Sequence, residues 1–275
     1  MFTRLRALIH RLNHSKMSTA SKPVHNTNAA CCTIPPVKSD YTPKGTYKAY
    51  GDFKKVYITG PEENAEKAIV CVYDIFGFKP QTQQGADIIA DQLKVKVFMP
   101  DFFEDGEPWP VEGFPPKTDE EKQKLQDFFG GLASPPVNKD RLINFGKVLK
   151  SEGVKSLGAY GFCWGGKVIM LAGGEESPFD AVSIVHPAML AVGDAEKLKV
   201  PLGIYPSNDE PQDEYEKMVE VLKKKPFADK SDWKKFDSFH GFAAARANLD
   251  DPDNKAKFED LYSTVIKFFT KAADF

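Results

Sequence analysis

Short apolar runs alternate with longer amphipathic segments from Thr46 to the end of the chain. Several runs, such as "AIVCVY" and "AVSIVH", are continuously apolar, which is typical of parallel strands covered on both faces. The segments between them have the periodicity of helices. This alternation predicts one α/β domain with an open, mostly parallel sheet and helices on both faces. The expected strands span residues 46–50, 53–59, 68–73, 95–99, 156–160, 181–186, 200–206 and 233–236, and the expected helices span residues 82–93, 118–129, 138–151, 165–173, 212–224 and 255–271.

Residues 102–137 interrupt this alternation with six prolines and many aromatic side chains. The segment is a long insertion between two expected strands, and such insertions in compact domains often act as lids or binding loops. A proline-rich excursion over the surface explains the same composition equally well. Both interpretations stay open.

Composition and charge exclude several classes of partner. The chain has 275 residues, of which 41% are hydrophobic, and its net charge is −2. This balance does not indicate a nucleic-acid or membrane-surface partner, and no apolar run approaches the roughly 20 residues that a bilayer requires. Four cysteines in a chain of this length do not form a secreted disulfide framework, so we expect a reducing compartment.

Residues 1–39 differ from the rest because they contain no Asp or Glu. Apolar residues on one helical face, among arginines, are typical of a mitochondrial transit peptide; they are Phe2, Leu5, Leu8, Ile9 and Leu12. A disordered leader, or translation that starts at Met17, fits equally well. We therefore separate a basic leader, residues 1–39, from a domain of residues 40–275, and expect a cytoplasmic protein with a mitochondrial alternative.

Cys163 lies at the centre of "SLGAYGFCWGGKVIML", between an expected strand and an expected helix. A strand that turns sharply into a helix strains the backbone of its turn residue and requires small neighbours, here Gly161 and Gly165. This arrangement is a nucleophile elbow. The N-terminus of the following helix favours a thiolate over a thiol. We predict that Cys163 is a nucleophile rather than a small buried hydrophobe.

The order of residues along the chain selects the base. Three of the five histidines fall within residues 1–39, which leaves His186 and His240. In hydrolases with a nucleophile elbow the order is nucleophile, acid, histidine. His240 follows the last expected strand and fits this order, whereas His186 comes too early. We interpret His186 as a pocket wall near the substrate.

The orienting acid is expected between the nucleophile and the base, on a loop that follows a strand. Asp209, in "GIYPSNDEP", has this position and would hold the tautomer of His240. Glu210 and Asp213 are adjacent alternatives. Asp237 is too close to His240 in the sequence to orient its ring from another loop.

The other cysteines have no predicted chemistry. Cys71 lies inside an apolar strand and is expected to be an inert core residue. Cys31 and Cys32 lack the histidines and the spacing of a zinc site. Because no phosphate-binding or dinucleotide motif is present either, we expect no cofactor and no metal.

Five motifs in this order, "YDIFG", "PDFF", "GFCWGG", "SNDE" and "HGFAAAR", resemble the dienelactone hydrolase family of the α/β-hydrolase fold. The resemblance covers about residues 40–275, and the leader with "CCTIPPV" is similar to fungal members. It implies that Cys163 is the nucleophile, Asp209 the orienting acid and His240 the base.

The resemblance also implies roles around the nucleophile. The backbone N–H groups of Ile75 and Trp164 would form the oxyanion hole. The family usually has a glutamate just before this isoleucine, which contacts the resting cysteine and helps to activate it. Here the residue is Asp74, which is one methylene shorter.

Two arginines hold the substrate carboxylate in characterised members of the family. Arg246 resembles the one that follows the catalytic histidine, and a planar guanidinium suits a carboxylate. The second arginine follows the "PDxx" motif in those enzymes, but here Glu104 and Asp105 stand in its place.

Taken together, these residues predict a hydrolase of lactones or activated carboxylic esters that works through a thioester. Its partner would be a small ester or lactone. Amides leave poorly from a thiol adduct, so peptidase activity is not expected. The alternative is a non-hydrolytic binding or redox-responsive thiol protein on the same fold, which the altered Asp74 and the missing second arginine leave open.

Overall fold

The computed structural model describes residues 37–275 except residues 63–65 and 113. Most of the predicted leader therefore lies outside the described residues. The first described residue, Val37, already forms hydrogen bonds with the domain: its N–H donates to the carbonyl of Ala245 (2.9 Å). The carbonyl of Val37 in turn accepts from Gln81 Nε2 (2.7 Å). The packed part of the chain thus includes residues before the predicted boundary at residue 40.

The described residues form one sheet with the strand order β1-β2-β4-β3-β5-β6-β7-β8. β1 and β2 pair antiparallel, as do β2 and β4, and all the other neighbours are parallel. The predicted mostly parallel sheet is therefore confirmed. Its strands are β1 (Thr46–Tyr50), β2 (Phe53–Thr59), β3 (Lys67–Val72), β4 (Lys96–Pro100), β5 (Ser156–Phe162), β6 (Ala181–Val185), β7 (Leu202–Tyr205) and β8 (Asp232–Trp233).

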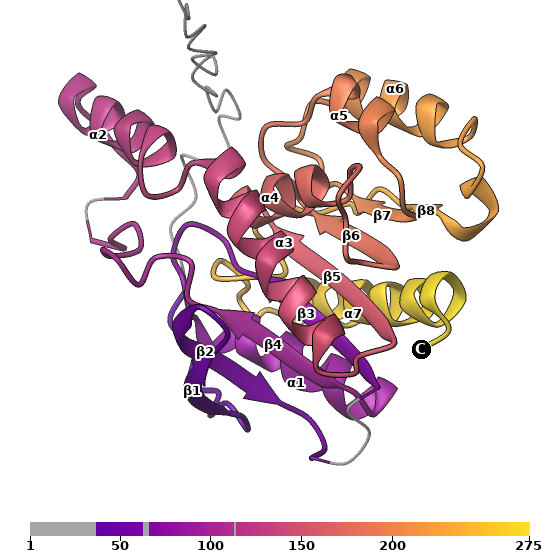
Figure 1. Cartoon of the computed structure of the whole chain (residues 1–275). Coiled ribbons are helices and arrows are strands. Elements are labelled where there is room, and N and C mark those ends of the chain that lie inside the picture. Colours follow the sequence, from indigo (N-terminus) through magenta and orange to yellow (C-terminus); the bar gives the residue numbers. More distant parts are fainter. Residues whose placement is uncertain (1–36, 63–65, 113) are drawn as a thin grey trace, which may run out of the picture.

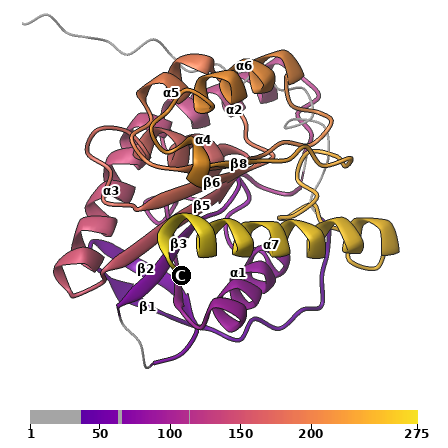
Figure 2. The ribbon, with the colours of Figure 1, turned by 90° about the vertical axis from the view of Figure 1, so that its right-hand side faces the viewer.

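Helices cover both faces of this sheet (Figures 1 and 2). Two of them, α1 and α7, pack side by side on one face, and α3, α4, α5 and α6 lie on the other, which confirms the α/β class. The α2 helix projects from the body of the molecule (Figure 1). The helices are α1 (Pro80–Leu93), α2 (Asp119–Gly130), α3 (Pro135–Ser151), α4 (Trp164–Ala172), α5 (Val192–Lys197), α6 (Gln212–Leu222) and α7 (Pro252–Ala273).

Two elements differ most from the sequence prediction. The strand expected over residues 233–236 is limited to β8, Asp232–Trp233, at the edge of the sheet. As an edge strand β8 pairs with β7 alone, so fewer backbone hydrogen bonds hold residues 234–236 in a strand. The α5 helix was not predicted, because its six residues are too few to show helical periodicity.

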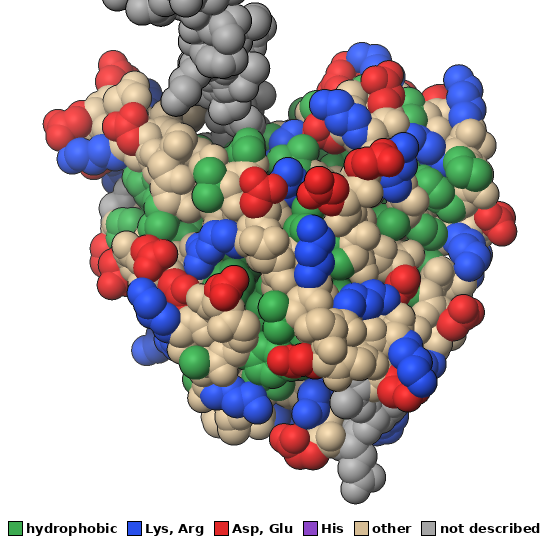
Figure 3. All heavy atoms as spheres, viewed as in Figure 1, with side chains coloured by type: hydrophobic (Ala, Val, Ile, Leu, Met, Phe, Trp, Pro, Cys, Tyr) green, Lys and Arg blue, Asp and Glu red, His purple; other side chains and the backbone are tan. Residues whose placement is uncertain are grey.

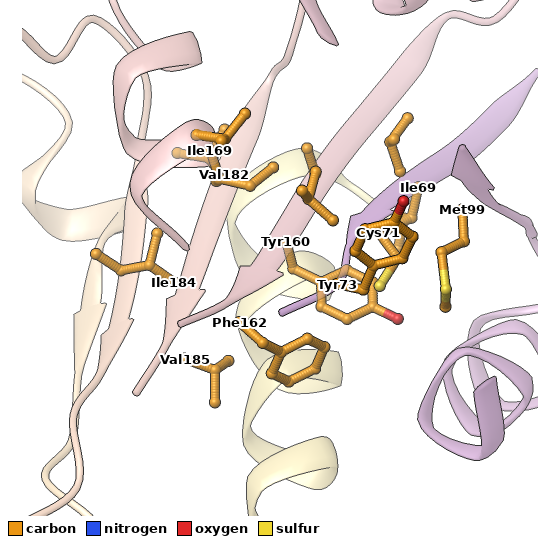
Figure 4. Packing of buried hydrophobic residues seen from close by; sticks show 14 of the residues in the cluster. Ile69, Cys71, Tyr73, Met99, Tyr160, Phe162, Ile169, Val182, Ile184 and Val185 are labelled. Atoms are coloured by element: carbon orange, nitrogen blue, oxygen red, sulfur yellow. The ribbon is translucent and has the colours of Figure 1, made fainter. Parts of the chain in front are cut away.

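Cys71 lies in the core of the sheet, as the sequence predicts. Figure 4 shows it among the side chains of Tyr73, Tyr160 and Met99. Burial raises the pKa of its thiol to about 12, although the neighbouring Tyr160 phenol works in the opposite direction. Burial also raises the pKa of the Tyr160 phenol well above its usual value. Both groups are therefore neutral in the folded protein at physiological pH.

Alkaline pH is expected to destabilise the fold through this thiol and phenol. In the unfolded chain Cys71 ionises near its ordinary pKa of 9.0 and Tyr160 near 10.0. Because the folded-state pKa values are higher, their contribution to the free energy of unfolding is intact below about pH 9. Above that pH it is lost, by up to about 1.4 kcal/mol per pH unit for each group.

Urea unfolding at a series of pH values from about 8 to about 11 measures this decline. The Cys71→Ala variant should show a shallower decline than the unsubstituted protein, because it lacks one of the buried groups whose pKa is raised by burial. An unfolding free energy that stays flat across this range would contradict the expectation.

Basic and acidic side chains intermingle over the face of the molecule drawn in Figure 3, in keeping with the net charge of −2. None of the described helices combines the length and the apolar character that crossing a bilayer requires.

Candidate active site

Cys163 occupies a sharp turn between the end of β5 and the first residue of α4. Its backbone has φ 52° and ψ −116°, which is a strained conformation for a residue with a side chain. The chains around it pack too closely for larger neighbours: a Cβ on Gly165 would lie 2.3 Å from the carbonyl oxygens of Val72 and Tyr73, and one on Gly161 would lie 2.5 Å from the Gly165 oxygen. The structure thus has the predicted elbow geometry, with Cys163 fully buried.

His240 follows β8, and its ring contacts a carboxylate from the loop after β7. Its Nδ1 lies 2.6 Å from Oε1 of Glu210, and both side chains are completely buried. Because a carboxylate only accepts hydrogen bonds, Nδ1 carries the shared proton. In the neutral ring Nε2 is then the basic nitrogen.

This contact corrects the predicted orienting acid. Asp209 does not hold the ring: its Oδ2 accepts a hydrogen bond from the backbone N–H of His240, at 2.7 Å. Glu210, named as an adjacent alternative, holds the ring instead, and the backbone N–H of Ser207 donates to its other carboxylate oxygen. Two neighbouring carboxylates thus bind the same histidine, one at its ring and one at its main chain.

The other acids considered from the sequence have different partners. Asp213 is exposed and pairs with Lys217 at 3.3 Å. Asp237 accepts a hydrogen bond from the side chain of Asn208 at 2.7 Å, which ties the loop after β7 to the loop that carries His240.

His186 directly follows β6, and its ring contacts those of Phe162 and His240. Its backbone has φ 34°, and its N–H donates to the carbonyl of Tyr205 at 2.8 Å. The centre of its ring is 5.1 Å from that of His240 and 5.5 Å from that of Phe162, which directly precedes Cys163. The structure therefore places the ring of His186 against the predicted base, His240, and against Phe162, the residue before the predicted nucleophile. A contact with substrate stays a prediction.

Asp74 is buried directly after β3 and connects two loops. Its Oδ1 accepts from the backbone N–H of Phe76 at 3.0 Å, and its Oδ2 accepts from that of Ala245 at 3.3 Å. Its carbonyl oxygen accepts from the N–H of Gly77 at 3.1 Å, which closes a turn around Ile75. The predicted activation of the cysteine by Asp74 stays a prediction, beside this observed role in joining the loops.

Arg246 is almost completely buried, six residues after His240. Its guanidinium carbon lies 4.9 Å from the centre of the Phe76 ring and 5.4 Å from that of Phe114. Both rings attract the cation through their faces. The side chain is thereby held against the loop of Ile75, while its predicted contact with a substrate carboxylate stays a prediction.

Glu104, which stands where the resemblance expects a second arginine, belongs to the framework. Its carboxylate accepts from the backbone N–H of Lys54 at 2.7 Å and pairs with Arg141 at 3.3 Å. Arg141 also donates to the carbonyl of Phe102 at 2.7 Å. These bonds fix the chain that follows β4.

Within the described ranges, no cluster of three or more His, Cys, Asp or Glu side chains could hold a metal ion. What the described residues do show is a buried acid–imidazole pair, Glu210 and His240, and a cysteine on an elbow, Cys163. These are the kinds of group that nucleophilic acyl transfer needs.

Comparison with known proteins identifies the family. Residues 55–273 match the model of the dienelactone hydrolase family. The chain belongs to this family. The chain is 34% identical over 218 residues to an uncharacterized AIM2 family protein of Schizosaccharomyces pombe, and the match covers 78% of this chain and 85% of that protein.

Two further comparisons agree with the dienelactone hydrolase assignment. The chain is 31% identical over 148 residues to a carboxymethylenebutenolidase homolog of Xenopus tropicalis, covering 51% of this chain and 55% of that protein. The crystal structure of a putative dienelactone hydrolase from Klebsiella pneumoniae superposes with a TM-score of 0.59 at 17% identity, covering 79% of this chain and 92% of that one. The fold is the α/β-hydrolase fold, as predicted, and membership of this family supports a hydrolase.

Proposed function

We propose that this dienelactone hydrolase family member cleaves lactones or activated carboxylic esters with Cys163 as nucleophile, His240 as base and Glu210 as orienting acid. The observation that carries the proposal is the buried pair of Glu210 and His240. A second support is that the ring of His186 packs on the ring of His240 and on that of Phe162, the residue before the strained elbow of Cys163. The carboxymethylenebutenolidase homologs among the relatives support a lactone as substrate.

In the first half of the reaction Nε2 of His240 takes the proton of the Cys163 thiol, and the sulfur attacks the carbonyl carbon. Glu210 stabilises the imidazolium that forms, because it accepts the hydrogen bond from Nδ1. The carbonyl oxygen becomes an oxyanion, to which the N–H groups of Ile75 and Trp164 donate. When the C–O bond of the ester breaks, the imidazolium protonates the leaving oxygen and a thioester remains.

Hydrolysis of the thioester completes the cycle. Nε2 of His240 takes a proton from a water molecule, whose oxygen attacks the thioester carbon. The C–S bond then breaks, the acid product leaves, and the proton returns to the sulfur of Cys163. Arg246 and His186 line the substrate side in this proposal, with Arg246 suited to a carboxylate on the substrate.

We also place the chain in a reducing compartment, either the cytoplasm or the mitochondrion. The support for this is that four cysteines in a chain of 275 residues do not form a secreted disulfide framework.

The proposal is tested by trapping the acyl-enzyme. Rapid acid quenching during turnover of p-nitrophenyl acetate, followed by proteolysis and mass spectrometry, should find an acetyl group on the peptide that contains Cys163. The peptide with Cys71 is the matched control, because its buried thiol has a pKa of about 12 and should stay unmodified. A Cys163 that is oxidised by peroxide but never acylated, with no ester turnover, would favour the redox-responsive alternative and contradict the proposal.

A further inference from the structure

The segment between β4 and α3 contacts both residues that the proposed function uses as oxyanion donors. Its first part donates a backbone hydrogen bond to Ile75, and its last part accepts one from the side chain of Trp164. We propose that this segment sets the oxyanion hole, with the main-chain N–H of Trp109 and the indole N–H of Trp164 as positioning groups. The inference rests on the proposed function.

On the Ile75 side, hydrogen bonds hold the peptide group that contains the donor and the peptide group that follows it. The carbonyl of Asp74 accepts from Gly77 at 3.1 Å, so the Ile75 N–H of the same trans peptide points the opposite way. In the next peptide, the Ile75 carbonyl accepts from the N–H of Trp109 at 2.8 Å, while the Phe76 N–H donates to the Asp74 side chain at 3.0 Å. Rotation of the donor therefore requires several bonds to break together.

On the Trp164 side, the donor residue is held through its own side chain. The indole is completely buried, and its Nε1 donates to the carbonyl of Ala133 at 2.7 Å. Its ring packs on Phe103, with ring centres 4.9 Å apart. Because Trp164 is the first residue of α4 and directly follows Cys163, fixing its side chain also fixes the orientation of its main-chain N–H beside the nucleophile.

One side chain of α2 links the two sides. Phe128 packs on Phe103, with ring centres 5.3 Å apart, and on the ring of Trp109, at 5.6 Å. Phe128 thus joins Trp109, which donates to Ile75, with Phe103, which packs on Trp164. A disturbance in the segment after β4 is transmitted to both N–H groups of the hole, although it lies far from them in the sequence.

The Trp164→Phe variant tests the indole contact, since phenylalanine keeps the main-chain N–H and an aromatic ring but lacks the indole donor. We expect kcat for p-nitrophenyl acetate to fall about ten-fold or more with little change in KM, because the interaction acts on the oxyanion of the transition state. Alkylation of Cys163 by iodoacetamide forms no oxyanion, so its rate should stay at the level of the unsubstituted protein.

Trp109 allows a matched pair of variants for the other side. Both Trp109→Ala and Trp109→Pro remove the indole, but only proline removes the N–H that donates to Ile75. The proline variant should hydrolyse the ester about ten-fold more slowly than the alanine variant, with equal rates of alkylation by iodoacetamide. Thermal unfolding of both variants checks that they fold.

The outcomes separate this inference from the proposed function. An unsubstituted protein that forms no acyl-enzyme at Cys163 would overturn the proposed function itself. If that acyl-enzyme forms, and Trp164→Phe either acylates at the unchanged rate or loses acylation and alkylation in parallel, the positioning role is wrong. If Trp109→Pro and Trp109→Ala are equally active, the role of the Trp109 N–H is wrong.

Discussion

Replacing Cys163 by alanine is expected to lower the turnover of an activated aryl ester by at least about 10⁴-fold. The sulfur is the atom that attacks the carbonyl in the proposed reaction, and alanine has no nucleophile in its place. The fold should persist, because alanine retains the Cβ that the strained backbone at this position already accommodates. The measurement is the initial rate of p-nitrophenol release, with thermal unfolding recorded for the same sample.

The Cys71→Ala variant is the control for this comparison, since it removes a cysteine of the same core without touching the elbow. It should turn over the ester at the rate of the unsubstituted protein. Turnover by Cys163→Ala at that same rate would rule out the assignment of the nucleophile.

Glu210→Gln is expected to reduce kcat by roughly 10³-fold, whereas Asp209→Asn should reduce it by less than about ten-fold. The amide nitrogen of a glutamine at position 210 can donate to Nδ1 of His240 and thereby place the ring proton on Nε2, which removes the base. An asparagine at position 209 retains an oxygen that can accept from the backbone N–H of His240, as Asp209 does now.

Steady-state kinetics of the two variants, with melting temperatures, decide between the carboxylates. Since the substitutions are the same chemical change at adjacent positions, a general effect of lost charge would appear in both. A larger loss of kcat in Asp209→Asn than in Glu210→Gln would reinstate the sequence-based choice of Asp209.

The contrast between Asp209 and Glu210 shows how far the sequence leads. Chain order and the apolar strand before them predict the correct loop, because this order follows from the topology of the sheet. Which of two adjacent carboxylates turns toward His240 depends on loop dihedrals, which have no periodicity to be read from the sequence. The side chain that reaches the ring is found only when the hydrogen bonds of Ser207 and His240 are known.

The helices and strands also divide into those that the sequence pattern predicts and those that it does not. The buried parallel strands were predicted within one or two residues because continuous apolar runs mark them. The short α5 helix and the end of β8 depend on local packing and pairing, and the sequence pattern does not show them. The contact from Trp109 to Ile75 joins backbone groups 34 residues apart, so residue types give no signal of it.

The carboxylate of Asp74 gives the two halves of the site a shared support. It holds the turn of Ile75 through Phe76 and the chain between His240 and Arg246 through Ala245. A substitution that shifts one loop therefore also shifts the Asp74 carboxylate to which the other loop is hydrogen-bonded. The effects of substitutions made in both loops are therefore not expected to add, because the two loops share the Asp74 carboxylate as a hydrogen-bond acceptor.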